Sequence, residues 1–158
     1  MAETAHELYC LLVPLSEDRL IVPRSCVTEV INYQVPTPIE GVPPWYLGTV
    51  AWGGRRVPLL SFEAACGRPA PRTSGRTRIV VMQGISEHAA ALGGHFAVIT
   101  QGFPQLVRLS ADVIHADDSR SFAERSPVLC QVRMVNEYPL IPDFERLEQH
   151  LAEEARPG

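Results

Sequence analysis

The chain has 158 residues, of which 46% are hydrophobic, and its 14 Lys+Arg against 18 Asp+Glu leave a net charge of −4. This size fits one globular domain, or two small subdomains that share a core. The acidic balance offers no whole-chain attraction for a phosphate backbone, so nucleic acid is not an expected partner.

No apolar run approaches the roughly 20 residues that span a bilayer, and residues 1–6 are too short and too polar for a signal peptide. We therefore expect a cytoplasmic protein that does not insert into a membrane. The four cysteines are well separated and form no CxxC pair, which is typical of free, buried thiols rather than of a zinc site or a disulfide framework.

The first elements predicted along the chain are a hairpin and a third strand. Residues 8–15 are a continuous apolar run of strand length, and a polar turn leads into a second strand at 19–22. Pro23 breaks this pairing, and a single helical turn fits 24–28. Residues 29–35 then alternate apolar and polar side chains, as a half-buried strand does.

A stiff loop follows, because residues 36–44 contain four prolines, which remove backbone donors and fix φ. Its apolar side chains, with the two aromatic residues behind them, are Ile39, Val42, Trp45 and Tyr46. On a rigid loop they could form a preorganised contact surface, or they could cap the end of a barrel. The pattern leaves both interpretations open.

The most strongly specified stretch is the hairpin that comes next. A Gly53–Gly54 pair between apolar strands at 47–52 and 55–60 suits a two-residue turn, in which both central residues need positive φ. Ser61 can then cap a short helix at 62–66.

Residues 68–75 are rich in proline, glycine and small polar residues and predict a linker between two halves. Beyond it, short β-type segments lie at 76–82, 95–100, 106–109 and 128–135. Polar loops are expected between them at 84–94 and 115–126. Eight or nine short strands without long intervening helices favour a barrel or a sandwich.

One longer helix is predicted, at residues 142–156. Asp143 can cap it, and Phe144, Leu147 and Leu151 form an apolar stripe. The opposite face carries glutamates, at Glu145, Glu148, Glu153 and Glu154. A helix this short is marginal alone, so we expect the stripe to pack onto the strands.

Signatures of catalysis or metal binding are absent from the sequence, which has no GxSxG, HExxH, P-loop or GxGxxG motif. His115, Asp117 and Asp118 have a metal-like composition, but in a polar loop they fit a solvated turn better than a coordination sphere. Cys26 with a distant histidine is a conceivable thiol pair, and nothing raises it above a buried thiol. We predict no catalytic residue, no metal and no cofactor.

The order and spacing of these elements resemble a known family. Residues 22–39 (VPRSCVTEVINYQVPTPI) and 41–62 (GVPPWYLGTVAWGGRRVPLLSF) are similar to the signature of CheW-like domains, the adaptor proteins of bacterial chemosensory arrays. The matching positions are Val27, Glu29, Val30, Gly41, Pro43, Gly48, Val50, Gly54, Val57, Pro58, Leu59 and Leu60. In residues 93–114 the matches are Phe96, Val98, Ile99, Val107, Leu109 and Ile114. The resemblance covers most of the chain, from about residue 8 to residue 141.

The chain departs from the family pattern at four positions, where the family has asparagine, arginine, aspartate and aspartate: Ala51, Gly53, Ser61 and Gln101. In the family that arginine lies near the glutamate that matches Glu29. We therefore expect Arg55 or Arg56 to take over as the partner of Glu29. The departures suggest a divergent member, such as one from a system that controls surface motility by pili.

The resemblance implies a mainly β fold of two intertwined, five-stranded barrels similar to SH3 domains, with short helices and a C-terminal helix. It would form a single domain over residues 7–157, with sub-barrels at about 15–67 and 76–141. It also implies a protein without catalytic activity. From the residues alone, a Cys/His enzyme using Cys26 or His115 and a generic small-barrel interaction module outside arrays remain alternatives.

The resemblance further implies two partners, the regulatory domain of a CheA-type histidine kinase and the cytoplasmic tip of chemoreceptors. By position, the surface facing the kinase would include Ile39, Val42, Pro43 and Trp45. The groove facing the receptor, between the barrels, would include Val27, Glu29, Val30 and Val98.

Overall fold

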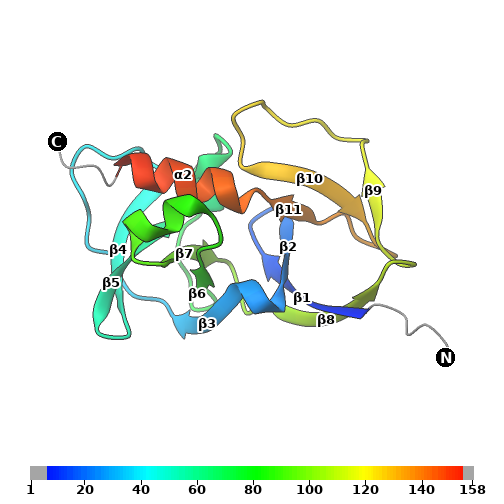
Figure 1. Cartoon of the computed structure of the whole chain (residues 1–158), viewed down its shortest axis with the longest axis horizontal. Helices are drawn as coiled ribbons and strands as arrows, with labels where there is room; N and C mark the ends of the chain where they lie inside the picture. The colour runs from blue at the N-terminus through cyan, green and yellow to red at the C-terminus, as the bar shows by residue number, and fades with distance from the viewer. Residues whose placement is uncertain (1–6, 155–158) are drawn as a thin grey trace.

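The computed structural model describes residues 7–154, which form a mainly β molecule with two sheets and a few short helices (Figure 1). The strands are β1 (Glu7–Pro14), β2 (Arg19–Pro23), β3 (Val27–Asn32), β4 (Tyr46–Trp52), β5 (Arg55–Leu60), β6 (Arg78–Gln83), β7 (His95–Thr100), β8 (Gln105–Ser110), β9 (His115–Asp117), β10 (Val128–Arg133) and β11 (Leu140–Pro142). The helices are η1 (Arg24–Cys26), α1 (Phe62–Ala65), η2 (Glu87–Leu92) and α2 (Phe144–Glu154).

Each sheet draws strands from both halves of the chain. The five-stranded sheet has the order β3-β6-β7-β5-β4, and the six-stranded sheet has the order β8-β1-β2-β11-β10-β9. The intertwined, mainly β architecture predicted above is therefore confirmed, although one sheet has six strands where five were expected. The sheets do not follow the expected sub-barrels at 15–67 and 76–141, because β6 and β7 pair with β3 and β5, whereas β1 and β2 pair with β8 and β11.

The five-stranded sheet closes on itself through the chain that follows β3. Thr37 and Thr49 exchange two backbone hydrogen bonds, of 2.8 and 2.9 Å, which join this segment to β4. The Gln34 side chain adds two more, to the backbone N–H and C=O of Ala51. Gly48 permits this close approach, since a Cβ built there would lie 2.1 Å from the carbonyl oxygen of Thr37.

Three apolar clusters make up the core. One lies within the five-stranded sheet, around Val57 and Ile79, and another within the six-stranded sheet, around Leu12 and Ile21. The largest, called here the junction core, draws on both sheets, η2 and α2: Val13, Leu15, Leu20, Val22, Tyr46, Leu60, Phe62, Val80, Met82, Leu92, Phe96, Val98, Leu140, Phe144, Leu147 and Leu151. The two sheets are thus held together by shared apolar packing.

The C-terminal helix was predicted at 142–156, and the structure has α2 at Phe144–Glu154. Residue 142 belongs to β11, and residues 155–156 lie outside the described part of the chain. The Asp143 carboxylate accepts a hydrogen bond from the backbone N–H of Arg146 at 3.1 Å, as a cap does. The predicted stripe is buried in the junction core, and the helix packs along η2 (Figure 1).

The central hairpin has the predicted construction. Gly53 and Gly54 adopt φ of 58° and 77° between β4 and β5, and the Ser61 hydroxyl accepts a hydrogen bond from the backbone N–H of Ala64 at 3.2 Å. The expected polar loops at 84–94 and 115–126 were wrong in part, because they contain η2 and β9. Within residues 7–154, no helix is long and apolar enough to cross a membrane.

Candidate functional site

An apolar groove of about 370 Å³ opens where the six-stranded sheet meets the segments next to β3 and β6, beside the first turn of α2. It is lined by strands β2, β10 and β11 and by the start of α2. The short helix η1 and Ile85, in the loop before η2, complete the lining. The lining residues are Ile21, Val22, Pro23, Cys26, Ile85, Leu129, Ile141, Pro142, Asp143, Phe144 and Glu145.

Two large apolar side chains of this groove face solvent. Ile85 is 62% exposed and Leu129 is 63% exposed. Concave apolar surfaces with exposed aliphatic side chains are typical of sites that bind another molecule. Because most of its lining is aliphatic or aromatic, the groove suits the apolar side chains of a protein segment.

The residues predicted for the receptor-facing groove occupy three different environments. Val27 and Val30, on β3, are half-buried and pack against the junction core, and Glu29 is exposed. Val98 lies in β7 and is 1% exposed, so its proposed place on a surface is wrong. None of the four lines the 370 Å³ groove, although Val27 directly follows Cys26, which does.

The groove residues that sequence reasoning missed had weak signals. Leu129 shares its face of the segment 128–135 with Gln131 and Arg133, so alternation alone gave it no sign of a binding role. Ile85 lies near the start of the segment 84–94, which was predicted to be a polar loop. Its neighbours in space come from β11 and α2, which no local pattern could place beside it.

Glu29 pairs with an aromatic donor instead of an arginine. The indole Nε1–H of Trp52 donates to its Oε1 at 2.9 Å. The expected partners bond elsewhere. Arg55 donates to the Gly93 carbonyl oxygen at 2.8 Å. Arg56 donates to the hydroxyls of Thr37 and Thr49 and to the Thr49 carbonyl oxygen. The expectation that Arg55 or Arg56 replaces the family's arginine is therefore wrong.

His95 completes the surface beside this pair. Its ring lies 4.9 Å from that of Trp52, and Arg55 donates to its Nδ1 while lying 5.4 Å from the Trp52 ring centroid. Burial, reinforced by the charge of Arg55, lowers the pKa of His95. Neutral His95 is thus the form that this arrangement favours.

The residues predicted to face the kinase are brought together by the loop before β4. Trp45 stacks on Tyr46 with ring centroids 5.8 Å apart, and His150 of α2 lies 6.1 Å from the Trp45 ring. Val42 and Trp45 pack partly against the junction core, whereas Ile39 is exposed. The loop is therefore anchored by some of its apolar residues and presents others to solvent.

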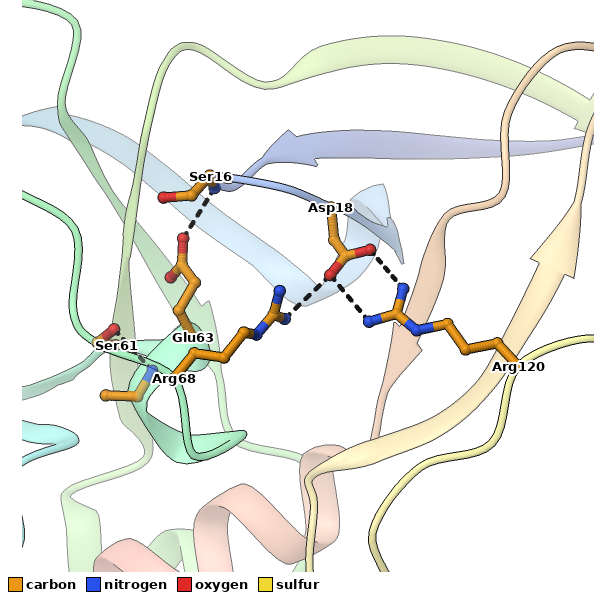
Figure 2. Close-up of polar contacts among 7 residues, drawn as sticks. Ser16, Asp18, Ser61, Glu63, Arg68 and Arg120 are labelled. Atoms are coloured by element: carbon orange, nitrogen blue, oxygen red, sulfur yellow. Dashed lines mark hydrogen bonds and ion pairs between the residues drawn. The ribbon is translucent and has the colours of Figure 1, made fainter.

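A second, polar junction connects the sheets (Figure 2). Arg68 and Arg120 donate to the carboxylate of Asp18 at 2.9 and 2.7 Å, and Glu63 accepts from the backbone N–H of Ser16 at 2.9 Å. Burial raises the pKa of Asp18, but hydrogen bonds and charge from the two arginines outweigh it, so the pKa is lowered. This network fixes the β1–β2 turn against the segment after α1.

The chemistry considered for the enzyme alternative finds no support in the geometry. Burial raises the pKa of the Cys26 thiol, which disfavours the thiolate that a nucleophile requires. Asp117, in the predicted metal-like cluster, instead accepts hydrogen bonds from Ser119 and Gln131 at 2.7 and 2.6 Å. Among the described residues, one group has side-chain atoms that could bind a metal ion and lie within 4.8 Å of one another: Glu87, His88 and Glu145. Glu145 also lines the groove.

Comparisons with known proteins agree with this architecture. A model of the CheW-like domain family matches residues 9–150. Among solved structures, the scaffolding protein TtCheW from Thermoanaerobacter tengcongensis is similar with a TM-score of 0.71 at 15% sequence identity, over 87% of this chain and 89% of that chain. No curated protein sequence matches the chain.

Proposed function

Because the chain belongs to the CheW-like domain family, the non-catalytic scaffold and coupling proteins of chemosensory signalling, we propose that it joins chemoreceptors to a CheA-type histidine kinase. In this role the chain acts in the cytoplasm, at the membrane-bound receptor array. One of its surfaces binds the cytoplasmic hairpin tip of a receptor, and another binds the regulatory domain of the kinase.

The observation that supports this function best is the apolar groove beside the first turn of α2. A receptor tip is a helical hairpin, and an amphipathic helix binds a groove by inserting apolar side chains at helical spacing. Each aliphatic side chain buried in such a groove contributes about 1.5–3 kcal/mol, which offsets part of the entropic cost of association. Exposed Ile85 and Leu129 provide such area.

The loop before β4 supports the second surface. Trp45 is fixed by its stack on Tyr46, and the backbone N–H of Tyr46 donates to the Pro43 carbonyl oxygen at 3.0 Å. A loop that is already ordered loses little conformational entropy when it binds. Exposed Ile39 would then contact the kinase domain without a prior rearrangement.

Calorimetric titration of the whole chain with each partner tests this proposal. We expect Leu129→Asp to weaken binding of a purified receptor hairpin by at least about tenfold, or 1.4 kcal/mol, and to spare binding of the kinase regulatory domain. Ile39→Asp should have the opposite selectivity. Both side chains are exposed, so neither change should unfold the protein.

Two outcomes would contradict the proposal. One is a wild-type chain that binds neither probe, which would favour an interaction module outside chemosensory arrays. The other is wild-type affinity of both variants for both partners, which would place the binding surfaces elsewhere on the molecule.

A further inference from the structure

Glu148 was expected on the glutamate-rich face of the C-terminal helix, and that expectation is wrong, because its side chain is 0% exposed on the buried side of α2. Its Oε1 accepts hydrogen bonds from the backbone N–H of Ser86 at 2.8 Å and from the Ser86 hydroxyl at 2.5 Å. Its Oε2 accepts one from the backbone N–H of Ile85 at 2.9 Å. Three donors from a segment 62 residues away thus converge on a single side chain of the C-terminal helix.

These bonds reach the groove directly. Ile85, whose N–H Glu148 binds, is one of the two exposed aliphatic residues of the groove, and Phe144 and Glu145 of the same helix also line it. Ser86 is in addition the cap of η2, because its hydroxyl accepts from the backbone N–H of His88 at 3.1 Å. One carboxylate of α2 therefore connects this helix to the start of η2 and to the margin of the groove.

An apolar residue at this position would avoid burying a carboxylate, but it would leave the backbone N–H groups of Ile85 and Ser86 without their acceptor. Burying a carboxylate is unfavourable unless its oxygens are fully hydrogen-bonded, and then its worth lies in fixing one geometry more than in added stability. The bonds of Glu148 fix the backbone of Ile85, a residue with few packing contacts of its own because most of its side chain faces solvent.

We propose that Glu148 is a positioning residue of the groove, which holds Ile85 against α2 in the arrangement that receives the partner helix. This inference rests on the proposed function, because the groove is the surface assigned to the receptor. Glu148 itself touches no partner. It acts through Ile85, whose backbone it fixes before binding.

The test compares Glu148→Gln with Glu153→Gln, an identical change at an exposed position of the same helix. Glutamine has nearly the same volume, but its NH₂ group would face a backbone N–H or the Ser86 hydroxyl in place of an acceptor. We expect Glu148→Gln to weaken binding of a receptor hairpin by about tenfold or more and to leave binding of the kinase regulatory domain unchanged. Glu153→Gln should change neither.

Equal losses with both partners would overturn the proposal, because a general structural defect does not discriminate between surfaces. Unchanged binding of the receptor hairpin to Glu148→Gln would overturn it as well. If the variant does not fold, Ser86→Ala removes one of the three donors and is measured in the same two titrations, with the same expected selectivity.

Amide hydrogen exchange separates this proposal from the proposed function. In the wild-type chain, the amides of Ile85 and Ser86 should be protected about as strongly as those in the middle of α2, and Glu148→Gln should remove this protection. Rapid exchange at both amides in the wild type would overturn the positioning role even if the hairpin binds. A protected wild type that does not bind the hairpin would refute the receptor assignment alone.

Discussion

Gly48 shows how one residue decides whether the five-stranded sheet can close. Its φ is 130°, a value that side chains rarely adopt, and an added Cβ would lie 2.1 Å from the Thr37 carbonyl oxygen. The neighbour is backbone, which is itself held by the hydrogen bonds between Thr37 and Thr49. The added Cβ and the Thr37 carbonyl oxygen could move apart only if the hydrogen bonds between Thr37 and Thr49 were broken.

We therefore expect Gly48→Ala to lower the free energy of unfolding by more than about 2 kcal/mol, as strained and overpacked positions do. The matched control is Gly53→Ala, where φ is 58° and a Cβ would meet nothing within 4 Å. That change should cost only about 1 kcal/mol, the ordinary penalty of a left-handed alanine. Urea denaturation of the two variants measures the difference, and equal losses would contradict the role of the close approach.

At the residue scale, the sequence was informative where a residue acts locally and misleading where its partner is distant. The Gly53–Gly54 turn and the Ser61 cap follow from local backbone needs and are confirmed. The partner of Glu29 was sought among arginines because the family resemblance suggested one, whereas the sheet closure brings Trp52 to it. The sequence identifies the segment with Val98 as a strand, but it does not reveal that side chains on both faces of β7 are buried.

At the element scale, the β1–β2 turn depends on a charge pair with the segment after α1. The side chain of Asp18 is only 8% exposed and is bonded to both Arg68 and Arg120. Since its pKa is lowered in the folded state, the native protein binds fewer protons than the unfolded chain at acid pH. The stabilisation is complete above the ordinary Asp pKa of about 3.9 and is lost as pH falls toward the folded value.

Asp18→Asn should consequently lower the free energy of unfolding at pH 7 by about 1.5–3 kcal/mol, the usual value of hydrogen bonds to charged groups. It should also make stability fall less steeply between pH 5 and pH 3 than in the wild type. Urea denaturation at several pH values measures both effects. Asp112→Asn, at an exposed position, is the control, and a pH profile of Asp18→Asn parallel to that of the wild type would contradict the assignment.

Elements with strong local signals were predicted and those made by tertiary contacts were not. The stripe on α2 repeats at helical spacing and is confirmed. Strand β9 has three residues and exists because it pairs with β10, so its own sequence carries little β signal. Helix η2 did have signals that were overlooked, since Ser86 caps its start and Gly93, at φ 74°, ends it.

At the scale of the whole molecule, the family resemblance and the mainly β, intertwined fold were predictable because strand order and spacing carry that information. The match over residues 9–150 bears out the resemblance. The groove was not predictable in detail, because it joins β2 to β10, β11 and α2, which follow β2 by more than a hundred residues of chain. The segment 68–75 has the composition of a linker, yet it connects strands of the same sheet.

That topology makes a prediction about how the molecule can be divided. A cut between Arg72 and Thr73, both exposed, leaves β1–β5 on one fragment and β6–β11 with α2 on the other. The pairs β3–β6, β5–β7, β1–β8 and β2–β11 all cross the cut, so neither fragment contains a complete sheet. Each fragment would also expose its share of the junction core to water.

We expect neither fragment to fold alone and the two to assemble when mixed in equal amounts, because only together do they complete both sheets. Circular dichroism and the dispersion of amide signals in NMR spectra of each fragment, and of the mixture, measure this directly. The control is the full chain with a protease site inserted between Arg72 and Thr73, which should stay folded and associated after cleavage. A dispersed spectrum and a cooperative thermal transition from either fragment alone would show that the halves are independent units, and would contradict the intertwined arrangement.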